Sequence, residues 1–283
     1  MRGILLLAAL LLSACQHVST PPPLTGQIRD LRSGQSLTAP ELVARLATPE
    51  RIIVGEQHDN RDHHQLQLWL LQELGQRRAQ GSLLLEMLTP DQQPRVDDVR
   101  RAASLPTDLP GALAWQSGWD WDLYGPIVRF ALGQPYSLLS ANLDNAEVRA
   151  FYAQSPTVSG LRSNAPSVKK ELLEQISGSH CGLLPTSQMP AMLAVQQQRD
   201  RRMAQRLIAA PTPSMLLSGA YHARKDVGVP LHVLDLGEPE APIVLMLAEQ
   251  GSEVTPAMAD YVWYTPATPA QDYCAEMRKQ MGK

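Results

Sequence analysis

Short apolar runs alternate with helical segments along most of this 283-residue chain, and this alternation restricts its fold more than any other feature. The pattern is typical of an α/β domain with a mostly parallel central sheet flanked by helices. Most runs are continuous, as expected for strands covered on both faces. The predicted strands are 51–54, 82–85, 136–139, 215–218, 231–234 and 243–247, with 261–264 as an edge strand between prolines.

Helices are predicted between these strands. Leucines and a tryptophan recur at helical spacing over 62–74. A second helix has Asp120 or Asp122 as its N-cap and Pro126 in its first turn, where proline is tolerated.

Two stretches are too long for simple crossovers between strands. Residues 87–135 and 145–210 are expected to form helical excursions over one edge of the sheet. All of 25–283 is predicted to belong to a single domain.

Polar side chains follow four of the predicted strands where those strands end. In open α/β sheets, ligands bind outside the carboxyl ends of the strands, so these side chains are expected to meet at one rim. A solvated loop explains any single strand end, but a cleft explains four of them better. The residues predicted for this strand-end cleft are Glu56, His58, His63, Glu86, Asn142, Arg199, Asp200, His222, Arg224 and Asp226.

A long helix is predicted from about 189 to 209. Met192, Met203 and Leu207 define its buried stripe, and Arg199 falls on the same stripe. An arginine that faces inward must be paired or must serve a ligand. An ion pair between Arg199 and an acidic residue is the preferred interpretation.

Two histidines and two carboxylates crowd the start of the first helix, namely Asp59, Asp62, His63 and His64. Such residues can bind a metal, but their spacing matches no zinc motif. Acidic residues in a first turn also interact favourably with the helix dipole. Metal binding by this group is therefore the weaker alternative.

The start of the chain has the parts of a secretory signal: Arg2, an apolar run and small residues before a cut. The run is well short of the roughly 20 residues that span a bilayer. Residues 1–14 are therefore expected to be removed as a signal peptide.

Leu12-Ser13-Ala14-Cys15 resembles a lipobox, the bacterial signal for acylating a cysteine and cutting before it. An ordinary signal peptide with a chance cysteine is the alternative. Gln16 is not the aspartate of an inner-membrane retention signal, so a lipid anchor on Cys15 in the outer membrane is favoured. Residues 15–24 contain three consecutive prolines and are interpreted as an extended tether.

The composition favours a folded protein without a nucleic-acid surface. Apolar residues make up 44% and charged residues 19%, and the net charge of −3 arises from mixed signs. Besides Cys15, the cysteines are Cys181 and Cys274, neither in a metal-binding spacing. The sequence leaves a disulfide and two separate thiols equally open.

Several of these motifs, taken in order, resemble the ChaN-like haem-binding lipoproteins and, more distantly, the TraB/Tiki and erythromycin-esterase group. The match runs from about 45 to 235, behind the lipobox. The motifs are Gly55-Glu56-Gln57-His58-Asp59-Asn60 with His63-His64, Leu85-Glu86, Trp119-Asp120 through Tyr124, His180-Cys181-Gly182, Arg199 through Ala204, and Gly219 through Pro230.

The resemblance implies haem capture for iron uptake in the bacterial envelope. It further implies a homodimer in which two haems lie face to face, with each iron held by one tyrosine. Tyr124 is the first candidate because a helix start favours a phenolate; Tyr152 is second, and Tyr221 remains a candidate. Basic side chains of the partner subunit would meet the propionates, and the candidates are Lys169, Lys170, His180 and Arg224.

Two functions are therefore carried forward. The favoured one is a haem-binding protein. The alternative is a metal-dependent or acid–base hydrolase that uses Glu56, Glu86 and His222. The sequence contains no nucleophile elbow and no recognisable metalloprotease motif.

Overall fold

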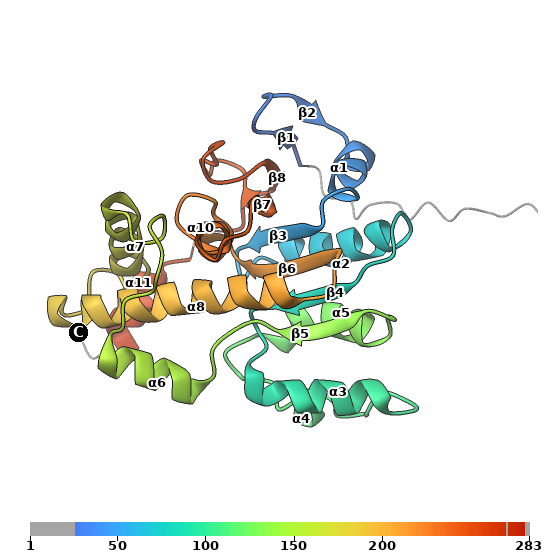
Figure 1. Ribbon diagram of the computed structural model, residues 1–283, viewed down its shortest axis with the longest axis horizontal. Helices are drawn as coiled ribbons and strands as arrows, with labels where there is room; N and C mark the ends of the chain where they lie inside the picture. The colour runs from blue at the N-terminus through green and yellow to red at the C-terminus, as the bar shows by residue number, and fades with distance from the viewer. Residues whose placement is uncertain (1–25, 270, 281–283) are drawn as a thin grey trace, which may run out of the picture.

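The computed structural model describes residues 26–269 and 271–280 of the chain (Figure 1). At its centre is an eight-stranded sheet in the order β2-β1-β8-β7-β3-β6-β4-β5. The strands from β8 to β5 are parallel, whereas β1 is antiparallel to both β8 and β2. The strands are β1 (Ile28–Asp30), β2 (Ser36–Leu37), β3 (Arg51–Glu56), β4 (Ser82–Leu85), β5 (Ser137–Ser140), β6 (Ser214–Gly219), β7 (Ile243–Glu249) and β8 (Tyr261–Thr265).

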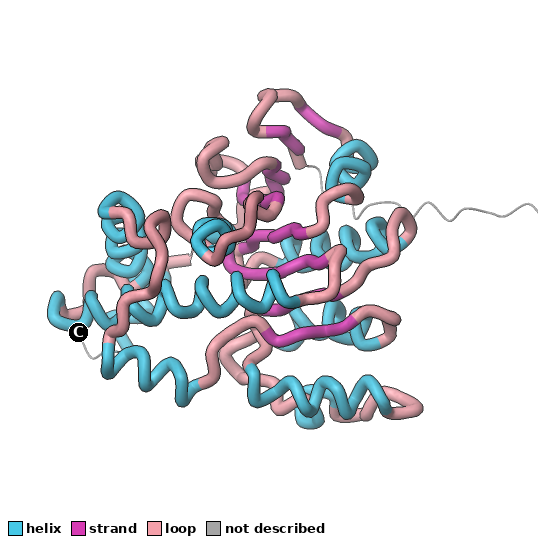
Figure 2. Tube along the Cα trace, in the orientation of Figure 1, coloured by secondary structure: helices cyan, strands magenta, loops and turns pink. Residues whose placement is uncertain are grey.

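Helices cover both faces of this sheet, as Figure 2 shows. Alternate residues of β3 divide between two apolar cores: Ile52 and Val54 face one layer and Ile53 faces the other. The first layer contains α1 (Ala39–Leu46), α2 (Arg61–Gly75), α3 (Gln93–Arg101), α4 (Leu109–Ala112) and α5 (Trp121–Leu132). The second contains α8 (Met189–Ala209), α9 (Ala220–Ala223) and α10 (Val229–Asp235).

Three further helices lie away from the strands. Helices α6 (Asn145–Gln154) and α7 (Pro166–Ser179) pack against α8, and α11 (Tyr273–Gln280) ends the described chain. The expected helical character of 87–135 and 145–210 is thus confirmed, since these segments carry α3 to α5 and α6 to α8 (Figure 1). They do not both cover one edge of the sheet, because α5 and α8 lie in the two opposite layers. No helix in the described part of the chain is long and apolar enough to cross a membrane.

Local sequence signals explain where the main helices begin. Asn60 caps α2 by accepting hydrogen bonds from the backbone N–H groups of Asp62 and His63. Asp120, rather than Asp122, caps α5. Pro126 therefore lies inside α5, beyond its first turn, which differs from the expected position.

Two of the predicted strands were wrong in type or position. Residues 231–234 belong to helix α10, because Gly228 and Pro230 start a helix there and a four-residue apolar run does not separate helix from strand. Strand β8 is not an edge strand, since β7 and β1 pair with its two sides.

The first three elements of the described chain, β1, β2 and α1, were not predicted from the sequence. Strands β1 and β2 have only three and two residues, too few to show a periodic pattern. Helix α1 does carry a signal, because Thr38 and Glu41 form a capping box around Pro40.

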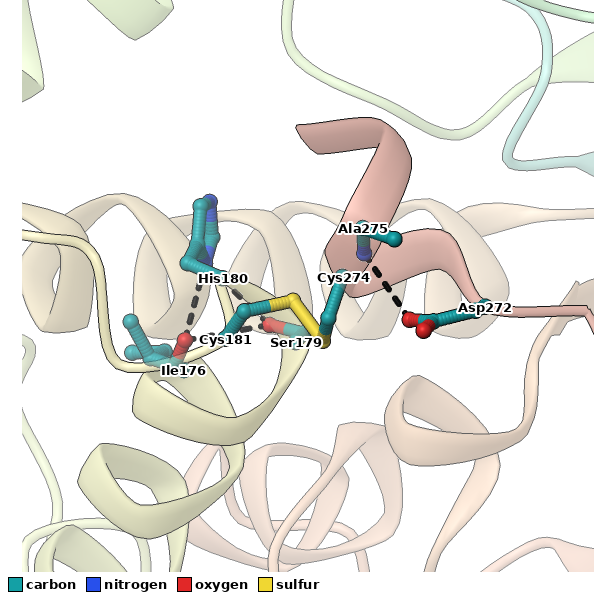
Figure 3. Close-up of a disulfide and its surroundings, with 7 residues drawn as sticks. All are labelled: Ile176, Ser179, His180, Cys181, Asp272, Cys274 and Ala275. Carbon is teal, nitrogen blue, oxygen red and sulfur yellow. Dashed lines mark hydrogen bonds between the residues drawn. A yellow bond between two sulfur atoms is a disulfide. The ribbon is translucent and has the colours of Figure 1, made fainter. Parts of the chain in front are cut away.

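The structure decides between the two alternatives for the cysteines. Cys181 and Cys274, 93 positions apart, form a disulfide with a Cα–Cα distance of 5.5 Å (Figure 3). The bond joins the end of α7 to the start of α11. Closing a loop of this length contributes on the order of 4–5 kcal/mol in the chain-entropy model.

Replacing Gly55 by alanine tests how tightly α9 packs on the sheet. A Cβ at this position would lie 2.7 Å from Ala223 Cβ and 2.8 Å from Met246 Sδ, so α9 must move. We expect Gly55→Ala to lower the free energy of unfolding by about 1–3 kcal/mol in urea denaturation. The control is Gly75→Ala, where nothing lies within 4 Å and a gain of about 0.5–1 kcal/mol is expected. Wild-type stability of Gly55→Ala would contradict the close contact.

Candidate functional site

The connections that leave strands β3 and β6 open a crevice at their carboxyl ends. The two strands are parallel neighbours, but the chain passes from β3 to α2 in one layer and from β6 to α9 in the other. Such a switch point is where open α/β sheets bind ligands. A cleft of about 750 Å³ lies there, within the size range of small-molecule and cofactor sites.

Strand ends form one part of this cleft, and later segments of the chain form its walls. Its lining is largely apolar, with Ala220, Met246, Ala248, Val254 and Met258 among the side chains. Helix α7 contributes Gln175 and Ser179, and α11 contributes Tyr273. The polar residues from the strand ends and their loops are Glu56, Gln57, His58, Asp59, His63, Tyr221, His222, Arg224 and Glu249.

Glu56, the last residue of β3, is buried beside three polar rings. Its Oε1 accepts a hydrogen bond of 2.5 Å from the Tyr124 hydroxyl and lies 3.1 Å from Nδ1 of His58. Its Oε2 lies 3.2 Å from Nδ1 of His64. These neighbours offset much of the cost of burying a carboxylate.

His58 is held with one ring nitrogen turned toward the cleft. Its Nδ1 lies within 3.1 Å of Glu56 Oε1 and 2.9 Å of the Tyr124 oxygen, two acceptors that fix the proton on Nδ1. Its Nε2 lies beside Gly219, where a Cβ would be only 2.6 Å away. Burial lowers the pKa of His58, but the hydrogen bond to Glu56 and the charges of Glu86 and Glu56 outweigh it, so the pKa is raised.

A second charged cluster lies on the other side of Gly219. His222 lies between two buried carboxylates, with Nδ1 2.6 Å from Asp200 and Nε2 3.3 Å from Glu86. The backbone N–H of Gly219 donates to the other oxygen of Glu86 at 2.8 Å. Burial disfavours the cation, but the two carboxylates raise the pKa of His222 to about 10, so the ring is an imidazolium at neutral pH.

The pKa values of the two acids in this cluster, Glu86 and Asp200, are shifted in opposite directions. Burial alone would raise the pKa of Glu86, yet the nearby His222 charge holds it well below its usual range. Burial raises the pKa of Asp200 despite the contact with His222. Asn142, just after the end of β5, supports the cluster, because its amide donates to the Glu86 carbonyl at 3.0 Å.

The histidines at the start of α2 point to different partners. His63 accepts from the Gln57 N–H and contacts Thr265, and burial lowers its pKa to about 4. His64 bonds the carbonyl of His58 through Nε2. Among the described residues, no group of three or more His, Cys, Asp or Glu side chains could hold a metal ion, so the geometry gives the metal alternative no support.

The tyrosines differ in how they meet the cleft. Tyr124 is only 1% exposed, and burial and the Glu56 carboxylate raise its pKa strongly. It does not line the cleft, so this geometry does not support the expected iron ligation by Tyr124. The position of Tyr124 in its helix could be read from the sequence, but its contact with Glu56 could not. Tyr152 is 38% exposed on α6, also away from the cleft. Tyr221 and Tyr273 line the cleft at 45% and 47% exposure.

Tyr273 was missed by the sequence analysis. It lies beyond the last predicted strand, outside every motif that was singled out. Its neighbour Cys274 was the available signal, since a disulfide constrains where the next side chain can lie.

The expected basic residues are mostly engaged elsewhere. Arg224 pairs with Glu171 at 3.0 Å and with Asp226 at 2.7 Å, while its guanidinium lies 5.8 Å from the Tyr221 ring centre. Arg199 lies within 4 Å of no carboxylate among the described residues, and its buried Nε has no hydrogen-bond partner there, so the expected close Arg199–acid pair is not found. Its charge still acts on the neighbouring Asp200, where burial raises the pKa and Arg199 opposes that rise.

The candidates for propionate binding lie on or just after α7. His180 bonds the Ile176 carbonyl through Nδ1 and does not line the cleft (Figure 3). Lys170 is exposed and lies 3.5 Å from Glu174, and Lys169 is half-buried beside it.

Comparison with solved structures gives one extensive likeness. The structure described as cofacial heme binding to ChaN of Campylobacter jejuni is 27% identical, has a TM-score of 0.77, and the match covers 86% of this chain and 97% of that one. An erythromycin esterase mutant in its open conformation matches at 16% identity and a TM-score of 0.47, covering 90% of this chain and 86% of its own. No protein with a curated description matches.

A family comparison covers more than half of the chain. The model described as "Haem-binding uptake, Tiki superfamily, ChaN" matches residues 42–233, which include both charged clusters and Tyr221. The chain therefore belongs to the ChaN family of haem-binding uptake proteins in the Tiki superfamily.

Proposed function

We propose that this protein binds ferric haem at the strand-end cleft, with Tyr221 as the iron ligand, and that it serves haem and iron acquisition. The observation that carries the proposal is the position of Tyr221, a half-exposed phenol on the wall of a largely apolar cleft. Family membership and the cofacial haem described for the Campylobacter jejuni protein support the choice of ligand.

Iron ligation by Tyr221 requires the phenolate form of its side chain. A free tyrosine has a pKa near 10, so ligation depends on ferric iron to stabilise the deprotonated form. The Arg224 guanidinium lies 5.8 Å from the centre of the Tyr221 ring. Glu171 and Asp226 hold that guanidinium in place, so it is not available to a propionate.

The charge of the cleft indicates how haem would be oriented. Glu56, Asp59, Glu249 and Glu253 all line it, and Arg224 is already paired. Propionates are repelled by these carboxylates and should point outward. The expected cations lie outside the cleft on or just after α7, namely Lys169, Lys170 and His180.

We propose a homodimer for the haem-bound state. A haem ligated by Tyr221 at a wall of this cleft would keep part of its surface open to solvent. A second copy with its own haem would cover that surface, as the word cofacial describes for the Campylobacter jejuni protein. The α7 cations of each partner would then meet the propionates of the other.

We also propose that lipid on Cys15 anchors the mature protein in the outer membrane, with the domain on the periplasmic side. The support is the apolar run that ends in Leu12-Ser13-Ala14-Cys15, together with the proline-rich residues after it. These positions, including the proposed tether 15–24, lie outside the described residues.

A second candidate function is acid–base hydrolysis at the same cleft, and the orientation of His58 favours it. With Nδ1 beside Glu56 and Tyr124, Nε2 is the ring nitrogen left to act as a base, and His58 lines the cleft. This differs from the expected use of His222, which is buried between two acids.

Haem ligation is tested by Tyr221→Phe, which removes the phenolate and keeps the ring. In hemin titrations, we expect the wild type to develop a high-spin ferric spectrum and the variant to lose it, with binding at least roughly tenfold weaker. Tyr152→Phe is the matched control, an exposed tyrosine away from the cleft. An unchanged spectrum in Tyr221→Phe would exclude this ligand.

Lipid anchoring is tested by Cys15→Ser in a bacterial host supplied with labelled palmitate. We expect the wild type to carry label and to sediment with outer membranes, while the variant carries none. Equal labelling of the two proteins would show that Cys15 is not the acylated residue.

Hydrolysis is tested with a chromogenic ester and His58→Ala, for which the rate should fall about 100-fold or more. The pKa of His58 is raised above 6.5, and only the neutral imidazole can act as a base. The wild-type rate should therefore increase as the pH rises through this raised pKa. Tyr221→Phe serves as the control that keeps the base. If His58→Ala hydrolyses the ester as fast as the wild type, the second function is wrong.

A further inference from the structure

The C-terminal helix contributes one wall of the cleft and is fixed there by a disulfide. Tyr273, the first residue of α11, lines the cleft at 47% exposure. The next residue, Cys274, is bonded to Cys181 just after α7, as Figure 3 shows. Helix α7 supplies Gln175 and Ser179 to the same cleft, so the disulfide joins two segments that line one site.

Tyr273 also ties this wall to the loop after β3. Its hydroxyl donates to Oδ2 of Asp59, which lies between His58 and the α2 N-cap Asn60. Burial raises the pKa of Asp59, but the hydrogen bonds from Tyr273 and Gln57 outweigh it and the pKa is lowered. At neutral pH the contact is therefore a phenol donating to a carboxylate, a charge-assisted hydrogen bond.

Little apolar packing holds α11 itself in place. None of its described side chains is fully buried; Cys274 and Met277 are half-buried and the others are exposed. Upstream, Thr268 donates to Glu249 at 2.6 Å at an exposed position. A segment with so few buried contacts opens at low cost unless a covalent bond fixes it.

We propose that the Cys181–Cys274 disulfide and the Tyr273–Asp59 hydrogen bond form a latch, and that Tyr273 is a binding residue that retains a flat aromatic ligand of porphyrin size in the cleft. This rests on the haem-binding function proposed above. Tyr273 lies beyond residues 42–233, the part of the chain that the family model matches.

The phenol of Tyr273 suits a retaining contact better than a metal ligand. Its hydroxyl is committed to Asp59, and that hydrogen bond is the main cause that raises its pKa to about 12. Its ring remains half-exposed toward the cleft and can lie against an apolar, planar surface. Tyr221, by contrast, has no carboxylate bonded to its hydroxyl in the described structure.

The test measures how fast hemin leaves the mature, full-length protein, by transfer to an excess of a haem-scavenging apoprotein. In the double variant Cys181→Ser/Cys274→Ser and in Tyr273→Ala, we expect dissociation at least tenfold faster, with the high-spin spectrum of Tyr221 ligation retained. Tyr273→Phe keeps the ring and loses the bond to Asp59, so its rate should lie between those of the wild type and Tyr273→Ala. Leu161→Ala, at a position that is 90% exposed and outside the cleft, should dissociate at the wild-type rate.

Two results separate the latch from general stability and from the haem proposal. Hydrogen exchange without hemin should become faster at α11 and at 57–60 in the disulfide variant, while the central strands keep their protection. Hemin bound and released at the wild-type rate by both latch variants would overturn the latch and leave the haem function standing. A wild type that binds no hemin would overturn the haem function and the assignment of its ligand. In that case, hydrogen exchange at α11 and 57–60 that is the same in the disulfide variant and the wild type would overturn the latch as well.

Discussion

The buried carboxylate of Glu56 is the interaction on which this site depends. It ends the central strand β3 and contacts His64 of α2, Tyr124 of α5 and His58 of the intervening loop. Removing one of these partners would leave this buried side chain with fewer hydrogen-bond partners, which costs on the order of 1–3 kcal/mol. A single side chain thus fixes two helices of one layer against the sheet and sets the orientation of the one histidine among them that faces the cleft.

The second cluster, with His222 between Glu86 and Asp200, is linked to the first through Gly219. The backbone N–H of Gly219 donates to Glu86. Because glycine has no Cβ, the His58 ring can occupy the space where a Cβ would otherwise lie. Both clusters are therefore built around the same few atoms of backbone at the end of β6. A side chain at this position would disturb both.

The parts of the fold that depend on local patterns could be predicted from the sequence, as strands β3 to β7 show. Parallel strands finish on the same side, which was enough to bring Glu56, Glu86 and His222 together. The fate of 231–234 could not be predicted, because four apolar residues fit a helix or a strand equally well. The inner position of β8 depends on β1, a strand too short to detect.

The choice among the tyrosines shows the same limit within the site. The position of Tyr124 in the first turn of α5 was visible in the sequence, but its partner lies 68 residues earlier in the chain. Only the packing of α5 on the sheet shows that the hydroxyl points inward. Likewise, the disulfide partner of Cys181 lies 93 residues away, and that bond brings Tyr273 to the cleft.

One turn of helix α9 carries the two most contrasting side chains of the site on consecutive residues. Tyr221 is turned toward the cleft, while His222 is buried in the charged cluster. The two residues are adjacent in the same helical turn, so one short piece of backbone positions both the phenol and the imidazolium. Any substitution that shifts the backbone of α9 therefore acts on a wall of the cleft and on the buried ion pairs at the same time.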